Sequence, residues 1–355
     1  MSKDLSILIV RLSAIGDVVM TTAAVRALKS KLPQVRTSWV VEPRSASILE
    51  GNPDIDNIIV WDERGVGPFL KLTRTLRREK FDVAIDFQGL ARSALVTMAS
   101  GATRRIGYRN GREFSKLAYN ELTSCKDAPK TRRCHHGIRC YLSLLKPLGI
   151  EIDPEDDQMR VVVSPEESAD AGEMLAQAGL GQGERFLAFC SATTRANKHW
   201  TEAGWAKLVD LTSQKTGLKA VFLGAKADYA SIDRILARAQ IPAINLAGKT
   251  TLKQSAAVID RSDAVVAVDT GLMHISVALG KTTVALFGPT TAWKNHIHRD
   301  NFTMISKNME CSPCRKKPTC ENFDCMTSIT ADEVMEVLQA KLTQCAEGVE
   351  GCRAI

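Results

Sequence analysis

The chain has 355 residues, of which 45% are hydrophobic and 25% are charged, which is the composition of a folded protein with a sizeable core. This length exceeds one ordinary α/β domain and suits two. No apolar run approaches the roughly 20 residues that cross a bilayer, and a strand-like segment begins at Ile7, which leaves no room for a signal peptide. We therefore expect a cytoplasmic protein, and we expect its ten cysteines to be reduced thiols.

The charge is distributed unevenly along the chain. Residues 1–150 carry 25 Lys and Arg against 14 Asp and Glu, whereas residues 151–355 carry 22 against 26. The first half is therefore suited to an anionic partner. A phosphorylated small molecule or an anionic membrane surface fits better than nucleic acid, because the chain has no recognised nucleic-acid-binding motif and no basic stripe interleaved with aromatic residues. An unevenly charged solvated surface would leave the same pattern.

Short β-rich runs alternate with segments of helical period, which indicates parallel sheets with crossover helices. In the first half we expect strand 7–11, helix 18–31, strands 37–42 and 58–61, helix 69–78, strand 82–87, and helices 90–99 and 136–148. Residues 151–157 have the composition of a linker.

The same alternation resumes in the second half. We expect strand 187–191, helix 202–215, strand 220–223, helix 229–239, strand 244–246, helix 252–261, strand 264–268, helix 272–279, strand 283–287 and a last helix 331–342. The predicted fold is α/β, with two Rossmann-like domains facing each other across a cleft. Their expected bounds are 1–160 and 161–330, followed by a C-terminal helix and tail, 331–355. Ligands are expected at the carboxyl ends of the strands.

The strongest local signal is a strand, turn and helix near the C-terminal end. The strand ends at Asp269, Gly271 permits a tight turn, and a helix follows at once. The amides of Thr270, Gly271 and Leu272 would then lack intrahelical partners and could bind phosphate, with His274 one turn further along. If Asp269 caps the helix instead, the segment is an ordinary βα turn.

A second signal lies after the N-terminal strand, at Ser13–Asp17. It has the position of a Rossmann phosphate loop, but it lacks GxGxxG and the P-loop lysine, and the carboxylate of Asp17 would repel a diphosphate. Asp17 could act as a general base, or it could cap a helix that starts at Val18.

A third signal, Cys190–Trp200, follows the first strand of the second half. The hydroxyls of Thr193 and Thr194 and the charge of Lys198 are the parts of a phosphate clamp. A solvated polar loop could have the same composition, but a second phosphate-type loop on the same sheet favours the clamp.

Taken together, these segments resemble glycosyltransferase family nine, the lipopolysaccharide heptosyltransferases. The resemblance covers nearly the whole chain, and Thr193–Arg195 and Lys198–Trp200 look most like the heptosyltransferase I type. The matching motifs, in the order of the family, are Ser13–Asp17, Asp86–Leu90, the helix start at His135 and His136, Thr193–Trp200, Asp269–His274 and Leu286–Thr290.

The resemblance implies a GT-B fold and an inverting transfer of heptose from ADP-heptose to the Kdo/heptose inner core of lipopolysaccharide. It also implies that no cofactor or catalytic metal is required. The acceptor would be of the Kdo-lipid A type, and the protein would be peripheral to the cytoplasmic face of the inner membrane. No nucleic acid is expected as a partner.

The resemblance also assigns roles to individual residues. Asp17 would be the general base, and Lys198 would stabilise the leaving group. The donor diphosphate would be held by Thr193, Thr194, Lys198, Asp269, Thr270, Gly271, Leu272 and His274. The chain departs from the family at Gly224–Lys226, where the first type has an acidic nucleotide contact, and Asp228 could take over that contact at the ribose. On the acceptor side we expect Ser13, Gly16, Gln88, Arg64, Arg92, Arg104 and Arg105.

Four cysteines, Cys311, Cys314, Cys320 and Cys325, have a spacing typical of metal ligands. A structural zinc or iron–sulfur site is chemically reasonable there. Reduced thiols, or a disulfide formed on purification, would fit the same spacing, and any metal would be structural.

Four alternative functions differ in how well they fit the sequence. Another nucleotide-sugar glycosyltransferase or a sugar-nucleotide epimerase could use the same fold. A binding module that has lost catalysis is disfavoured because the chain retains Asp17 and Lys198. An NAD oxidoreductase is disfavoured because neither half has GxGxxG with a downstream acid.

Overall fold

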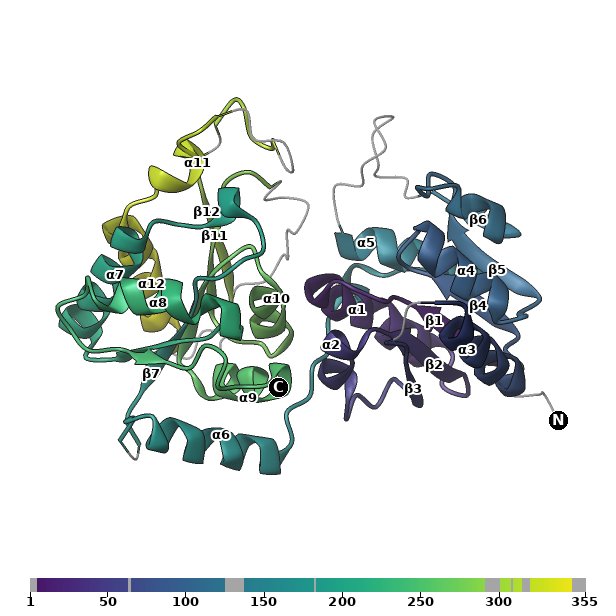
Figure 1. Cartoon of the computed structure of the whole chain (residues 1–355), viewed down its shortest axis with the longest axis horizontal. Coiled ribbons are helices and arrows are strands. Elements are labelled where there is room, and N and C mark those ends of the chain that lie inside the picture. Colours follow the sequence, from purple (N-terminus) through teal and green to yellow (C-terminus); the bar gives the residue numbers. More distant parts are fainter. Residues whose placement is uncertain are drawn as a thin grey trace. The chain divides into compact units, whose positions relative to one another are not determined.

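A computed structural model describes residues 5–62, 65–124, 137–181, 183–290, 301–307, 309–314 and 320–346. The chain divides into two compact units, Met1–Val162 and Val163–Ile355, and each is described here by itself. Each unit is a parallel sheet covered by helices, which confirms the predicted α/β fold class (Figure 1).

The described part of the first unit contains a six-stranded sheet in the order β3-β2-β1-β4-β5-β6, with every neighbouring pair parallel. The central strand β1 is buried along its whole length. Its apolar residues Ile7 to Val10 run without alternation because both faces of the sheet are covered. The strands are β1 (Ser6–Val10), β2 (Arg36–Val41), β3 (Asn57–Val60), β4 (Val83–Asp86), β5 (Arg104–Tyr108) and β6 (Glu121–Thr123).

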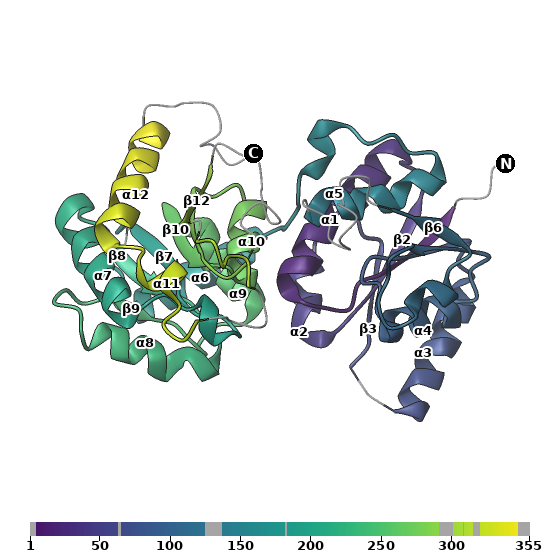
Figure 2. The ribbon, with the colours of Figure 1, turned by 90° about the horizontal axis from the view of Figure 1, so that it is seen from above.

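The direction in which the chain crosses this sheet decides which helices share a face. From β1 to β3 the chain moves one way across the sheet, and from β3 to β6 it moves the other way. Because the crossovers are right-handed, the helices that connect β1 to β3 lie on one face of the sheet and those that connect β3 to β6 lie on the other. Accordingly α1 packs with α5, whereas α4 packs with α3 and η2 (Figure 2). The helices are α1 (Ile15–Lys31), α2 (Pro43–Ala46), α3 (Val66–Glu79), α4 (Ala91–Ala99) and α5 (Gly137–Leu142), with 3-10 turns η1 (Ser47–Leu49), η2 (Ser115–Ala118), η3 (Ser143–Leu148) and η4 (Pro154–Asp157).

The described part of the second unit also has a six-stranded parallel sheet, in the order β12-β11-β10-β7-β8-β9. Strands β7 and β10 are neighbours at its centre, so the loops that follow them leave from the same edge. The strands are β7 (Phe186–Cys190), β8 (Lys219–Phe222), β9 (Ile244–Asn245), β10 (Ala264–Val268), β11 (Thr283–Phe287) and β12 (Phe302–Ser306).

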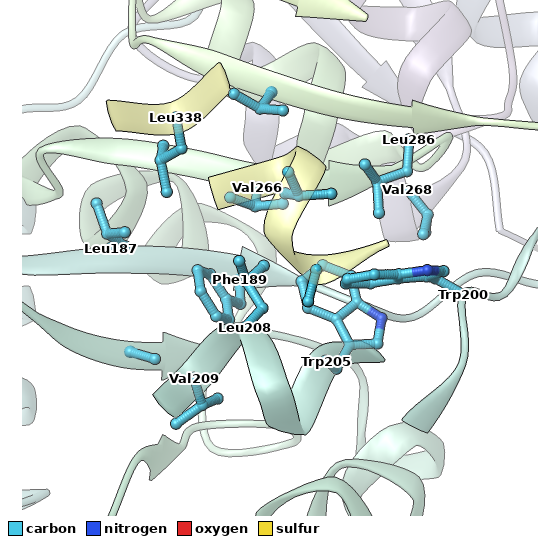
Figure 3. Packing of buried hydrophobic residues seen from close by; sticks show 14 of the residues in the cluster. Leu187, Phe189, Trp200, Trp205, Leu208, Val209, Val266, Val268, Leu286 and Leu338 are labelled. Atoms are coloured by element: carbon cyan, nitrogen blue, oxygen red, sulfur yellow. The ribbon is translucent and has the colours of Figure 1, made fainter. Parts of the chain in front are cut away.

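The helices of the second unit enclose an aromatic core. Trp205 of α7 packs against Phe189 of β7 and edge-to-face against Trp200, with ring centroids 5.5 and 5.2 Å away (Figure 3). Helix α12 packs on α7 and adds Leu338 to this core, so it belongs to the second unit. The helices are α6 (Pro165–Gln177), α7 (Glu202–Thr216), α8 (Tyr229–Leu236), α9 (Leu252–Arg261), α10 (Gly271–Ala278), α11 (Asp324–Thr327) and α12 (Ala331–Ala346), with 3-10 turns η5 (Ala196–Lys198) and η6 (Lys226–Asp228).

Strands β5, β6 and β12, the long helix α6 and the single-turn helices α2 and α11 were not predicted from the sequence. Strand β5 begins with two arginines, β6 has three residues, and most of β12 is only partly buried at the sheet edge, so none has a strong apolar pattern. Helix α6 did carry a start signal. Ser164 and Glu167 form a capping box, with Ser164 Oγ accepting a hydrogen bond of 3.1 Å from the amide of Glu167.

Candidate functional site

The site of the second unit is built on the loops that follow β7 and β10. Cys190, the last residue of β7, is paired in register with Ala267, so the two loops begin side by side. The first loop reaches Lys198 through η5, and the second consists of Asp269 and Thr270 before α10 begins. The structure therefore brings together the two segments that the sequence singled out as phosphate-binding.

Lys198 and Asp269 form a buried ion pair between these loops. Lys198 Nζ lies 2.5 Å from Asp269 Oδ2, and the two side chains are 14% and 10% exposed. Burial by itself would raise the pKa of Asp269, but Lys198, with a smaller contribution from His274, outweighs it and holds that pKa below its ordinary value. The pair is therefore charged, and the carboxylate fixes the position of the ammonium group.

The N-terminus of α10 presents backbone donors at the same place. Thr270 is the N-cap and has extended backbone angles, and its side chain makes no capping hydrogen bond. Asp269 pairs with Lys198 rather than capping the helix, so the interpretation of this segment as an ordinary capped turn is wrong. The first amides of α10, at Gly271 and Leu272, have no intrahelical acceptor and suit an anion. His274, one turn along, is buried.

The loop that carries Lys198 is anchored from behind by Trp200. The indole Nε1 donates to the backbone oxygen of Ile329 at 2.9 Å, and the ring packs on Trp205. Next to it, His199 Nε2 lies 2.9 Å from the backbone oxygen of Thr193. These contacts hold the loop in one conformation.

The two threonines of this loop lie differently. Thr193 is partly buried, and its hydroxyl lies 3.5 Å from the backbone oxygen of Asp269, whereas Thr194 is exposed to solvent. Only Thr193 is therefore tied to the second phosphate-type loop.

Asp228, the predicted ribose contact, lies after β8, the strand next to β7. Its Oδ2 accepts a 2.7 Å hydrogen bond from the amide of Ala225, closing the turn η6. The residue is therefore at the expected edge of the sheet, but its carboxylate already has a structural partner.

In the first unit, Asp17 lies in the first turn of α1, whose N-cap is Ala14. The interpretation of Asp17 as an N-cap is therefore wrong. Its carboxylate lies 2.5 Å from a guanidinium nitrogen of the buried Arg11 and accepts a 2.7 Å hydrogen bond from Tyr141 Oη. The Asp17 side chain is 40% exposed, so it is held by these two partners but not buried.

Arg11 and Tyr141 were not predicted as site residues. The guanidinium of Arg11 also donates to the backbone oxygen of Phe87 at 2.7 Å, which ties the end of β1 to that of β4. Burial, with a further contribution from Asp17, raises the pKa of Tyr141 far above its ordinary value, so the phenol stays protonated and donates to Asp17. Arg11, at the end of a strand, could have been found from the sequence; Tyr141, 124 residues from Asp17, gave no local signal.

Gln88 supports the loop that precedes Asp17. Its Oε1 accepts hydrogen bonds from the amides of Leu12 and Ser13 at 2.9 and 3.3 Å. Gln88 and Ser13 thus lie next to the Asp17 turn, and Gly16 lies within the first turn of α1. The structure brings this part of the predicted acceptor set together.

Of the four predicted acceptor arginines, three lie in the described part of the chain, and each already has a partner in the first unit. Arg92 forms an ion pair with Glu42 and stacks over the ring of Trp61, with its guanidinium carbon 4.3 Å from the centroid. Arg104 forks onto Glu121 at 2.6 and 2.9 Å, and Arg105 donates to backbone oxygens.

Arg104 and Arg105 open β5 and so lie at the amino end of the strands, whereas Asp17 follows the carboxyl end of β1. Their guanidinium groups bind Glu121 and backbone oxygens around the sheet, so we leave both residues out of the proposed acceptor site. Arg64 lies outside the described residues.

Two expectations concerned the cysteines: that all of them are reduced, and that four of them could hold a structural metal. Cys140 of α5 is disulfide-bonded, so the expectation that all cysteines are reduced is wrong at this position. In the cluster, Cys311, Cys314, Cys320 and Cys325 are free thiols, and burial, with the neighbouring thiols, raises the pKa of Cys325 to about 11. Within the described ranges, no three His, Cys, Asp or Glu side chains are placed to hold a metal ion.

Comparison with known proteins agrees with this arrangement. Lipopolysaccharide heptosyltransferase 1 of Pseudomonas aeruginosa is 28% identical, with 95% of this chain and 98% of the relative aligned. Lipopolysaccharide heptosyltransferase 2 of Escherichia coli is 25% identical, over 96% and 99% of the two chains.

A solved family 9 glycosyltransferase from Veillonella parvula superimposes with a TM-score of 0.82 at 22% identity, covering 97% of this chain and 99% of that one. This likeness shows the GT-B fold. Residues 69–323 match glycosyltransferase family 9 (heptosyltransferase). The chain is therefore a glycosyltransferase and belongs to family 9.

Proposed function

We propose that this enzyme transfers heptose from ADP-heptose to the Kdo/heptose inner core of lipopolysaccharide, with inversion at the anomeric carbon and without a catalytic metal. The observation that carries the proposal is the buried Lys198–Asp269 pair beside the N-terminus of α10, where the Thr270 side chain makes no capping hydrogen bond. The heptosyltransferases of P. aeruginosa and E. coli that align along almost the whole chain support the choice of sugar and acceptor.

The second unit would bind the donor and stabilise the leaving group. When the bond between the anomeric carbon and the diphosphate oxygen breaks, negative charge develops on that oxygen. Lys198 has an ammonium proton left to offer because Asp269 occupies only part of its donor capacity, and the amides of Gly271 and Leu272 add fixed partial charges. A lysine held in place by a carboxylate needs little reorganisation when the charge appears.

The first unit would supply the base. The acceptor hydroxyl loses its proton to Asp17 as its oxygen forms the new bond to the anomeric carbon, and ADP leaves from the opposite side of the sugar. Arg11 and Tyr141 each donate to the carboxylate of Asp17 and so hold it in one orientation. Ser13, Gly16 and Gln88 would line the acceptor side of this turn, and the membrane-borne acceptor would bring the enzyme to the cytoplasmic face of the inner membrane.

The proposal is tested by a donor screen with the full-length enzyme and Kdo-lipid A. ADP-heptose, UDP-sugars and GDP-sugars are compared for release of the nucleotide and for sugar added to the acceptor. We expect transfer from ADP-heptose alone. Preferential transfer from a UDP- or GDP-sugar would overturn the donor assignment.

A further inference from the structure

The large apolar side chains exposed on the described residues gather in the first unit. Apart from Val60 and Tyr229, all of them lie on α3, on α4, or on η2 and the residue before it. Phe114 and Leu117 are the most exposed, at 80% and 77%. The six residues, here called the apolar face, are Val66, Leu70, Leu95, Met98, Phe114 and Leu117.

The topology places these six residues on one side of the sheet. The crossovers from β3 to β4, β4 to β5 and β5 to β6 all proceed in one direction, so α3, α4 and η2 cover the same face. Helix α4 contacts both α3 and η2, and α3 and α4 lie side by side in Figures 1 and 2. Within each element the exposed apolar residues are three or four positions apart, which puts each pair on one side of its helix.

The segments that carry the apolar face are strongly basic. Residues 66–80, 91–99 and 109–120 contain nine lysines and arginines but only two acids, Glu79 and Glu113. Lys71, Arg74 and Arg78 are exposed along α3, and Lys116 lies between Phe114 and Leu117. Exposed aromatic and aliphatic side chains flanked by lysine and arginine are the pattern of a surface that inserts into an anionic lipid interface.

We infer that the apolar face docks the first unit on an anionic bilayer, with Phe114 and Leu117 inserted among the lipids and the basic residues of α3 on the headgroups. A symmetric dimer through this face would place two strongly basic surfaces against each other, so a second copy of the chain is the poorer partner. In the described part of the chain no helix is long and apolar enough to span a bilayer. The inference deepens the proposed function, since it names the surface by which the enzyme would reach a lipid-borne acceptor.

The test is co-sedimentation of the full-length protein with vesicles, without donor or acceptor, so that its outcome does not depend on the proposed reaction. Vesicles of phosphatidylethanolamine with phosphatidylglycerol are compared with vesicles of phosphatidylcholine. We expect binding to the anionic vesicles that weakens with salt. Phe114→Ser combined with Leu117→Ser should lower the affinity by about tenfold or more, because two exposed apolar side chains no longer insert.

Arg74→Glu combined with Arg78→Glu should lower the affinity by a similar factor and reduce its salt dependence. Matched controls come from the second unit. Tyr229→Ser removes an exposed apolar side chain, and Lys215→Glu reverses an exposed charge, and neither should change vesicle binding.

Circular dichroism melting shows whether each variant is folded. The inference is overturned if the wild type fails to bind anionic vesicles, or if the folded Phe114/Leu117 variant binds them as tightly as the wild type. It is also overturned if these substitutions instead abolish a dimer of the free protein while vesicle binding persists. If transfer to Kdo-lipid A fails while vesicle binding follows the pattern above, only the proposed function is contradicted.

Discussion

Replacement of Lys198 by methionine would leave Asp269 buried without its cation. At 2.5 Å, with side chains 14% and 10% exposed, the pair is desolvated on both sides. Removing one member of such a pair destabilises a protein by about 3 to 5 kcal/mol, because the remaining charge stays buried and no longer has an opposite charge beside it. An exposed pair is worth about 0 to 1 kcal/mol. The expected cost of Lys198→Met therefore lies well above that of a surface lysine.

The pH dependence of this cost has a definite sign. In the wild type the pKa of Asp269 is lowered, so its contribution to stability is present above the unfolded value of about 4 and is lost as the pH falls through the folded pKa. Without Lys198, burial is the largest remaining influence and raises that pKa. The deficit of Lys198→Met should therefore be largest at neutral pH and should shrink as the pH falls and the buried carboxyl takes up a proton.

Urea denaturation followed by circular dichroism measures the effect in the full chain. Lys207→Met is the matched control, because Lys207 pairs with Asp332 in the same unit but both side chains are more than half exposed. Adding Asp269→Asn to Lys198→Met should restore most of the lost stability, since no buried charge remains. If Lys198→Met costs no more than Lys207→Met, or if Asp269→Asn gives no recovery, the account of the buried pair is refuted.

Three further predictions follow from individual contacts. Tyr141→Phe removes a 2.7 Å hydrogen bond from Asp17 and should lower kcat about tenfold with little change in the donor KM; a kcat within twofold of the wild type would show that the phenol does not position the base. Gly204→Ala would place its Cβ 2.6 Å from the ring of Trp200, so it should lower the free energy of unfolding in urea by about 1 to 3 kcal/mol and weaken ADP binding measured by calorimetry. In the control Gly67→Ala the new Cβ meets no atom, and the free energy of unfolding should stay the same or rise. Equal effects of the two substitutions would contradict the packing around Trp200. Transfer should persist in EDTA and give a product of inverted anomeric configuration by NMR, and loss of activity that Mg²⁺ restores would contradict metal-free stabilisation of the leaving group.

The fold could be predicted largely from periodicity, because buried parallel strands such as β10 are uninterrupted apolar runs. The edge strand β12 escaped prediction, since most of its residues are only partly buried and show no such run. The phosphate-type loops were predictable because each follows directly from a strand end and because β7 and β10 are neighbours.

The partners of the site residues were harder to predict. That Asp269 pairs with Lys198 rather than capping α10 depends on a contact between residues 71 positions apart. Likewise Tyr141 reaches Asp17 only because α5 packs against α1. Basic composition also misled the prediction of Arg104 and Arg105, whose guanidinium groups bind Glu121 and backbone oxygens. The sequence shows how many charged residues a segment has, whereas only the tertiary structure shows which groups those residues contact.

The central claim is that Asp17 removes the proton from the acceptor hydroxyl, and single-turnover transfer by Asp17→Asn tests it most directly. Asparagine keeps the size of the side chain and an oxygen that can accept from Arg11 and Tyr141, so ADP-heptose binding should match the wild type. The rate of heptose transfer to Kdo-lipid A should fall by about 10² to 10⁴, while Asp62→Asn, an exposed carboxylate of the same unit, should leave it unchanged. Transfer by Asp17→Asn at a rate near that of the wild type would contradict the account.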